Sequence, residues 1–176
     1  VVGEGTAGIL GATLLNLAAV HLAAQATLEP ARRRRLCVVV DEFHRMPGAD
    51  YERYLAELSK VGASLILATQ TLARLDALDR LRARALRATL FANLDGLVAF
   101  HCGAKDAKDL VDELGPDVAV DDLVSLGEHR CYVRMSRGRE RLPAFSVELD
   151  PPPEGDPRLA AALAELSSAR HGRALD

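Results

Sequence analysis

The run Leu36-Cys37-Val38-Val39-Val40-Asp41-Glu42 predicts the fold of this chain and the place of its chemistry. Residues 36–40 are apolar and β-branched, which favours a strand buried on both faces of a parallel sheet. Ligands in open α/β folds bind at the carboxyl ends of such strands. There Asp41 suits a Mg²⁺–nucleotide complex, and Glu42 suits polarisation of the water that attacks a γ-phosphate. The pattern is that of a Walker B motif, and an ordinary strand end with two solvated acids is the alternative.

A second apolar run, residues 63–68, ends at Thr69-Gln70. Between the two runs we expect a helix at about 51–60 with Asp50 as its N-cap. A strand, a helix and a strand at this spacing predict a βαβ crossover with parallel strands. Thr69 and Gln70 would then lie at the same sheet edge as the acid pair, where they can hydrogen-bond a γ-phosphate or its water. A polar strand end without a ligand fits the same residues.

Residues 6–28 predict a helix with an apolar face. Its middle is free of charged residues, so a membrane span is one interpretation, and a helix buried against the sheet is the favoured one. Residues 71–94 predict an arginine-rich helical segment. Its arginines could contact DNA or a neighbouring subunit's nucleotide. The four arginines at 32–35 could contact DNA phosphate, and solvated side chains are the simpler reading of both sets.

The remaining pattern predicts a third strand and a hairpin. The expected elements are a strand at 97–102, short helices at 105–114 and 120–126, a hairpin from 129–135 and 142–149, a linker at 151–155 and a helix at about 157–170. The arginine-rich hairpin turn at 136–139 could contact DNA or a partner. A polar tail, expected to be flexible, follows the last helix.

Composition bounds these interpretations. The 176 residues suffice for one domain with a core, and a net charge of −3 gives no global attraction to nucleic acid. Three scattered cysteines, Cys37, Cys102 and Cys131, argue against a disulfide framework or a zinc site, so we expect them to be buried small hydrophobes. The chain begins Val-Val-Gly-Glu, which favours a piece of a longer protein.

Several stretches together resemble the coupling-protein family of type IV secretion and conjugation, the VirD4/TraG/TraD-like ATPases. They are residues 38–43, 60–76, Asn93, Phe100 and 103–107. The run 60–76 is far more specific than the Walker B pattern alone. The resemblance covers about residues 3–150 and includes the segment named for TraM recognition in TraD-like members.

The resemblance implies an α/β fold, the RecA-like P-loop NTPase three-layer sandwich. This chain would be its C-terminal half, with a mainly parallel sheet and a terminal β-hairpin. Residues 1–150 would be the C-terminal portion of the motor domain, and residues 151–176 a linker, a short helix and a flexible tail. A motor of this family uses ATP and Mg²⁺ and forms a homo-hexamer at the cytoplasmic side of the bacterial inner membrane; any membrane anchor would lie outside this fragment.

The resemblance also implies partners and residue roles. Such a motor binds the relaxosome with its relaxase and a TraM-like adapter, and drives single-stranded DNA toward the secretion channel. Asp41 would be the Walker B acid on Mg²⁺ and Glu42 the catalytic base that orients water. Gln70 would be the sensor that contacts the γ-phosphate, with Thr69 beside it at the nucleotide.

Two departures from the family pattern keep alternatives open. No Gly-x-x-x-x-Gly-Lys-Ser/Thr motif occurs, so this chain alone is not expected to hydrolyse ATP. Ser59 stands where the family usually carries an arginine; either Lys60 substitutes, or the trans-acting arginine lies elsewhere, or the motor is impaired. The alternatives are a non-catalytic docking or receptor module, or another RecA-like pump or pilus-biogenesis ATPase.

Overall fold

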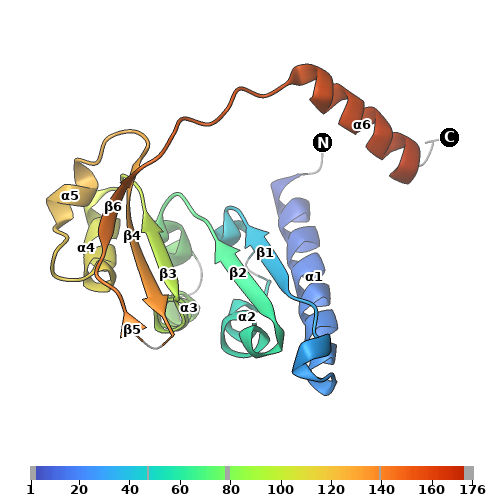
Figure 1. The fold of residues 1–176 in the computed structure, drawn as a ribbon, viewed down its shortest axis with the longest axis horizontal. Helices are drawn as coiled ribbons and strands as arrows, with labels where there is room; N and C mark the ends of the chain where they lie inside the picture. Colours follow the sequence, from blue (N-terminus) through green and yellow to red (C-terminus); the bar gives the residue numbers. More distant parts are fainter. Residues whose placement is uncertain (1–2, 47, 78–79, 139, 173–176) are drawn as a thin grey trace.

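The computed structural model describes residues 3–46, 48–77, 80–138 and 140–172, which form two sheets with helices packed beside them (Figure 1). In chain order the elements are α1 (Glu4–Ala23), η1 (Ala24–Thr27), η2 (Pro30–Arg32), β1 (Leu36–Val40), η3 (Phe43–Arg45), α2 (Tyr51–Glu57), η4 (Leu58–Val61), β2 (Ala63–Leu67), η5 (Leu72–Ala77), α3 (Arg80–Ala92), β3 (Gly96–Ala99), α4 (Ala104–Leu114), α5 (Val120–Val124), β4 (Arg130–Arg137), β5 (Glu140–Arg141), β6 (Phe145–Glu148) and α6 (Pro157–His171).

The first sheet is the parallel pair of β1 and β2. Its register runs from Leu36 opposite Ala63 to Val40 opposite Leu67. Helix α2 lies between the strands in sequence and begins after Asp50, whose carboxylate accepts a hydrogen bond from the Arg53 backbone N–H at 3.1 Å. The predicted parallel crossover and its N-cap are therefore confirmed.

The second sheet is antiparallel. Strand β4 lies at its centre and pairs with β3 on one side and with β5 and β6 on the other. The predicted third strand and hairpin are present, but the expectation of a mainly parallel sheet is wrong. Among the described strands only β1 and β2 are parallel, because β3 pairs with the hairpin strand β4 instead of extending the first sheet. An apolar run predicts a strand without predicting which neighbour it pairs with.

Among the described residues, helices cover only one face of the β1–β2 pair. Val40, Phe43, Tyr51, Leu75, Leu86 and Leu90 form the core beneath it. On the other face Val39 is 66% exposed and Ile66 is 53% exposed, and the same face carries the exposed Cys37. The expectations of a strand buried on both faces and of three buried cysteines are thus wrong here, since the described residues supply only two of the three layers of the expected sandwich.

Helix α1 packs through a narrow face. Ala19 and Leu22 contact the cluster of Tyr54, Leu58 and Val61, and the Tyr54 hydroxyl donates to the Leu15 carbonyl. The helix also carries large apolar side chains that are exposed, namely Ile9, Leu10, Leu14, Leu17 and Val20. The helical segment Gly5–Thr27 is long and apolar enough to cross a membrane by length and composition alone. The helix is therefore packed against the domain as predicted, though along one face only.

The C-terminal region leaves the body of the molecule. Residues 149–156 run as an extended segment to α6, whose side chains are exposed along its whole length (Figure 1). Asp156 caps this helix by accepting from the backbone N–H groups of Arg158 and Leu159 at 2.8 and 3.3 Å. The helix predicted at 157–170 is confirmed, and the end of the predicted tail, 173–176, lies outside the described residues.

The segment that follows β2 is clamped by α3 and α4. Asp106 of α4 is 6% exposed and accepts from the Thr71 hydroxyl at 2.5 Å and from the Leu72 backbone N–H at 2.9 Å. Arg87 of α3 donates to the Leu72 carbonyl at 2.7 Å and to Asp109 at 2.6 Å. These bonds join the two sheets through η5, and they show that Arg87 is a packing residue and not a solvated one.

We predict that Asp106→Ala lowers the free energy of unfolding by about 2–3 kcal/mol, because it leaves a partly buried backbone N–H and a partly buried hydroxyl without their acceptor. Urea denaturation followed by circular dichroism measures this change. Asp112 lies on the exposed side of the same helix, so Asp112→Ala is the matched control and should change the stability by less than about 0.5 kcal/mol. Equal effects of the two substitutions would contradict the clamp.

A pH dependence follows from Tyr51 in the core. Burial, with a smaller contribution from Tyr54, raises the pKa of Tyr51 to about 12. The unfolded chain releases this proton near pH 10 and the folded chain holds it until about pH 12. Stability is therefore lost as the pH rises between these values, by about 2–3 kcal/mol in total. Urea titrations across this range should show a smaller loss for Tyr51→Phe, and an unchanged pH slope would contradict the burial of the phenol.

Candidate functional site

Two strand ends meet at the carboxyl edge of the parallel pair. The backbone ladder continues past the strands, since the Ala68 N–H donates to the Val40 carbonyl at 2.9 Å and the Phe43 N–H donates to the Ala68 carbonyl at 3.2 Å. Asp41-Glu42 and Thr69-Gln70 therefore leave the sheet together at one edge, as the crossover predicted. What these four residues bind stays a prediction.

The turn after β1 holds Glu42 in an unusual backbone conformation. Glu42 has φ 49° and ψ 46°, the left-handed region that residues with a side chain seldom adopt. The Asp41 carboxylate accepts from the Glu42 N–H at 2.9 Å. The next residue, Phe43, is buried and packs edge-to-face on Tyr51, with the two ring centroids 5.6 Å apart. The Tyr51 hydroxyl donates to the Phe43 carbonyl at 2.9 Å. Strain of this kind persists where the surroundings over-determine it, often at functional sites.

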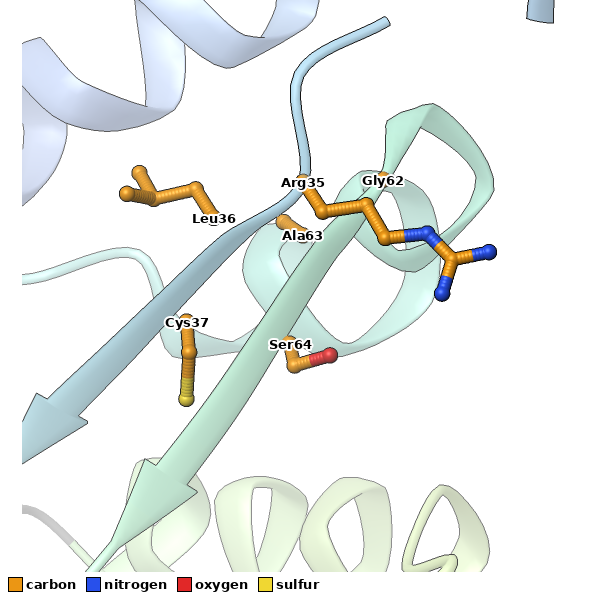
Figure 2. Close-up of a pocket in the computed structure, with 6 residues that line it drawn as sticks. All are labelled: Arg35, Leu36, Cys37, Gly62, Ala63 and Ser64. Atoms are coloured by element: carbon orange, nitrogen blue, oxygen red, sulfur yellow. The ribbon is translucent and has the colours of Figure 1, made fainter. Parts of the chain in front are cut away.

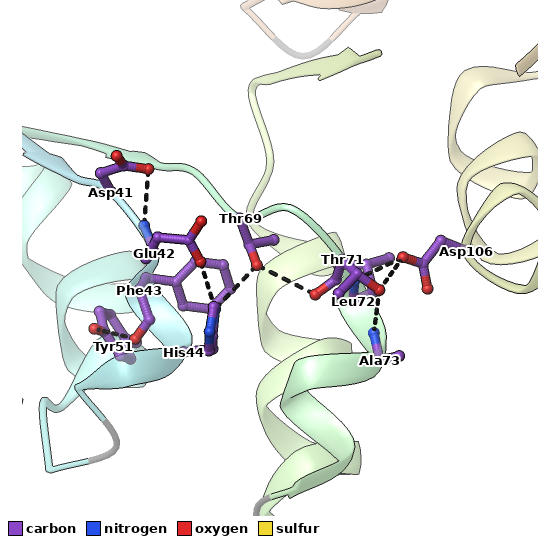
Figure 3. A network of polar contacts seen from close by, with 10 residues as sticks. All are labelled: Asp41, Glu42, Phe43, His44, Tyr51, Thr69, Thr71, Leu72, Ala73 and Asp106. Carbon is purple, nitrogen blue, oxygen red and sulfur yellow. Dashed lines mark hydrogen bonds and ion pairs between the residues drawn. The ribbon is translucent and has the colours of Figure 1, made fainter. Parts of the chain in front are cut away.

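His44 connects the two strand ends. Its Nδ1 lies 3.3 Å from Glu42 Oε2 and 3.2 Å from Thr69 Oγ1 (Figure 3). The His44 side chain is 10% exposed and that of Glu42 is 22% exposed. The sequence pattern placed His44 in a loop and gave it no role. The only local signal is its position two residues after the acid pair, and that spacing does not say that the ring turns back toward β2.

A chain of polar contacts continues from Thr69 to α4. The Thr69 hydroxyl donates to the Thr71 carbonyl at 3.2 Å, and the Thr71 hydroxyl donates to the buried Asp106 (Figure 3). Gln70 lies between these two threonines in sequence and is exposed to solvent. The clamp on η5 therefore fixes the backbone on which Gln70 is carried.

Asp41 fits a contact to a nucleotide-bound magnesium ion better than a metal site of its own. Its carboxylate is exposed at the strand end. Within the part of the chain that the structure describes, no group of three or more His, Cys, Asp or Glu side chains is arranged to hold an ion. Mg²⁺ in nucleotide sites is typically held by one or two carboxylates together with phosphate oxygens and water, so a single exposed aspartate suffices.

Lys60 lies at the opposite edge of the sheet. It precedes β2 and is exposed, and its carbonyl accepts from Arg33 at 3.0 Å. A five-residue strand separates it from Thr69 and Gln70, a length of about 16 Å. Lys60 is therefore too far away to contact the acid pair of its own chain.

A shallow hollow of about 430 Å³ also lies away from the acid pair. Figure 2 shows it at the amino ends of β1 and β2, where it is lined by Arg35, Leu36, Cys37, Gly62, Ala63 and Ser64. None of the predicted site residues lines it. The candidate site is therefore an open edge and not this hollow.

Comparison with known proteins bears on the fold. No protein-family model matches the sequence, and no curated protein matches it. Solved structures of the bacterial conjugative coupling protein TrwB do match. The unbound monoclinic form of TrwBdeltaN70 matches with a TM-score of 0.59 and 20% sequence identity over 75% of this chain. TrwB in complex with ADP and Mg²⁺ matches with a TM-score of 0.61 and 20% sequence identity over 79% of this chain. TrwB in complex with the non-hydrolysable ATP analogue ADPNP matches with a TM-score of 0.58 and 21% sequence identity over 75% of this chain.

These matches concern part of a larger fold. The chain spans only 34 to 36% of the length of those TrwB chains. At about 20% identity the likeness establishes architecture and not activity. The chain therefore has an α/β fold like that of a segment of the conjugative coupling protein TrwB.

Proposed function

We propose that this chain is part of an ATP-driven DNA and protein translocation motor, one that couples the relaxosome to a type IV secretion channel in conjugative transfer. The observation that carries the proposal is the meeting of Asp41-Glu42 and Thr69-Gln70 at one edge of a parallel pair, with His44 between them. The fold likeness to a conjugative coupling protein supports it.

In this proposal each polar residue has a separate task. Asp41 would contact the Mg²⁺ of an ATP–Mg²⁺ complex, the ion supplying charge neutralisation at the phosphates. Glu42 would orient the attacking water and accept its proton. Gln70, with Thr69, would hydrogen-bond the γ-phosphate end of the nucleotide. The TrwB structures with ADPNP and with ADP and Mg²⁺ support nucleotide as the ligand class.

The proposal requires a second wall for the nucleotide. These 176 residues contain no Walker A motif, so the phosphate cradle has to come from another segment or subunit, and this chain alone would not turn over ATP. The exposed apolar face of the β1–β2 pair is consistent with a missing layer. In a homo-hexamer, Lys60, at the end of β2 opposite the acid pair, would be a candidate to reach a neighbouring subunit's nucleotide.

The proposed partners are single-stranded DNA, the relaxase with its relaxosome, a TraM-like adapter and the secretion channel, at the cytoplasmic side of the bacterial inner membrane. Because the net charge is −3, DNA contact would have to be local. Exposed arginines at 32, 34 and 35 and Arg137 of the hairpin are the candidates. Cross-linking from the Arg137 position should recover DNA or relaxase; recovery of neither would favour another RecA-like pump or a pilus-biogenesis ATPase.

A non-catalytic docking or receptor module is the second candidate function. It is favoured by Ser59, which stands in place of the expected arginine, and by the absence of a Walker A motif from this sequence. Such a module would keep the fold and the partner contacts without turnover. ATPase measurement separates the two candidates, because the docking module predicts relaxosome binding with no nucleotide hydrolysis.

We predict that Glu42→Gln lowers the DNA-stimulated kcat for ATP by about a hundredfold or more, with little change in KM, because the water loses its proton acceptor. Asp41→Asn should raise the Mg²⁺ concentration needed for half-maximal rate. The assay uses a protein in which this chain is joined to its Walker A segment.

The matched control is Asp112→Asn, a neutralised carboxylate on the exposed side of α4. It should leave both kcat and the Mg²⁺ dependence unchanged. Turnover that survives the Asp41→Asn, Glu42→Gln double substitution would show that the assignment of the acids is wrong. A parent protein that binds relaxase and never hydrolyses ATP would favour the docking module.

A further inference from the structure

His44 Nδ1 faces two oxygen atoms, one of a carboxylate and one of a hydroxyl. The Glu42 carboxylate carries acceptor oxygens, and its Oε2 is 3.3 Å from His44 Nδ1. The Thr69 hydroxyl has one hydrogen, and the Thr71 carbonyl at 3.2 Å can only accept it. When the hydroxyl donates there, Thr69 Oγ1, at 3.2 Å from His44 Nδ1, is left as an acceptor for the ring.

This arrangement decides where the imidazole carries its proton. An unprotonated Nδ1 would direct its lone pair at the carboxylate, which is repulsive in a site where the ring is nine-tenths buried. The neutral ring must therefore be the Nδ1–H tautomer. His44 Nδ1 is 3.2 Å from Thr69 Oγ1 and 3.3 Å from Glu42 Oε2, and both distances exceed the usual N–H···O distance of about 2.9 Å, as one hydrogen placed between two acceptors would give.

We propose that His44 is a positioning residue that sets the spacing of the two strand ends through this single shared Nδ1–H. It holds the Glu42 carboxylate and the Thr69 hydroxyl on either side of one ring nitrogen, so that the acid keeps a fixed distance from the segment that carries the predicted sensor Gln70. The catalytic consequence rests on the function proposed above, whereas the hydrogen-bond geometry does not.

The clamp on η5 makes this spacing rigid on the β2 side. Thr69 is tied to the Thr71 carbonyl, and Thr71 is tied to Asp106 on α4. On the β1 side, Phe43 is buried next to His44 and fixes the short η3 turn on which the ring is carried. With both backbones held, the ring connects two fixed points, and its loss would free the Glu42 side chain without moving the strands.

The tautomer is measured on this 176-residue chain without nucleotide. Long-range ¹H–¹⁵N spectra at alkaline pH distinguish a protonated from an unprotonated Nδ1, and His44→Asn assigns the signal by its loss. We expect His44 to carry its hydrogen on Nδ1, whereas the exposed His101 should show the Nε2–H form that free histidine prefers in water. Glu42→Ala combined with Thr69→Val removes both acceptors and should shift His44 toward Nε2–H. An Nε2–H form in the unaltered chain would overturn the proposal.

The functional arm compares two substitutions in the protein joined to its Walker A segment. The amide of His44→Asn places a donor near the position of Nδ1 and should retain most of kcat. His44→Leu has no donor and should lower kcat about tenfold or more with KM for ATP nearly unchanged, because a misplaced catalytic group costs rate and not ground-state binding. If His44→Asn were as impaired as His44→Leu, the working atom would be Nε2 and the positioning role would be wrong.

The tautomer measurement and the kinetic comparison test different parts of the proposal. A parent protein without ATPase activity would overturn the proposed function and leave the tautomer result to decide the geometry. If His44→Leu did not fold, the tautomer in the unaltered chain and in the Glu42→Ala, Thr69→Val variant would still confirm or overturn the shared hydrogen bond. If the parent protein hydrolysed ATP and His44 were the Nε2–H tautomer, the proposed motor function would stand and the positioning role of His44 would be wrong.

Discussion

The candidate site depends on the parallel pairing of β1 with β2. Because Val40 lies opposite Leu67, both strands reach the same edge within one residue of each other. A two-residue shift of register would separate the Glu42 and Thr69 side chains by about 7 Å more and leave His44 able to contact only one of them. The buried cluster of Val40, Phe43 and Tyr51 holds this register by anchoring the β1 end in the core.

The second constraint is the polar connection between the two halves of the molecule. Buried polar groups persist where their hydrogen bonds are made, and Asp106 makes two to the start of η5. Together with Arg87 it ties the segment that carries Gln70 to α3 and α4. A contiguous path of polar contacts therefore runs from Glu42 through His44, Thr69 and Thr71 to Asp106 on α4, the helix that packs against the antiparallel sheet.

The antiparallel half contains a charge that is costly to bury. Arg134 of β4 is 1% exposed, and its closest acid is Glu113 of α4 at 3.9 Å. Burial, with the nearby Arg141, lowers the pKa of Arg134, and Glu113 partly offsets this. Glu113 also pairs with Arg141 at 3.4 Å, so one acid serves two arginines that join β4 and β5 to α4. Loss of Glu113 would leave Arg134 without a counter-charge in the interior.

The amino-acid sequence by itself determined the local elements and the order of the chemistry along the chain. Local signals act within a few residues, so periodicity and turn chemistry predicted the elements that they form. These signals are the apolar runs that end in Asp41-Glu42 and Thr69-Gln70, the Asp50 cap and the turn residues of the hairpin. Tertiary structure alone decided the partner of β3, the exposure of Val39 and Ile66, the burial of Asp106, the ion pair of Arg87, and the position of His44 between the two strand ends. Each of these depends on which distant segments meet, because an imidazole or a carboxylate acquires its role from the groups that surround it in space and not from its neighbours in sequence.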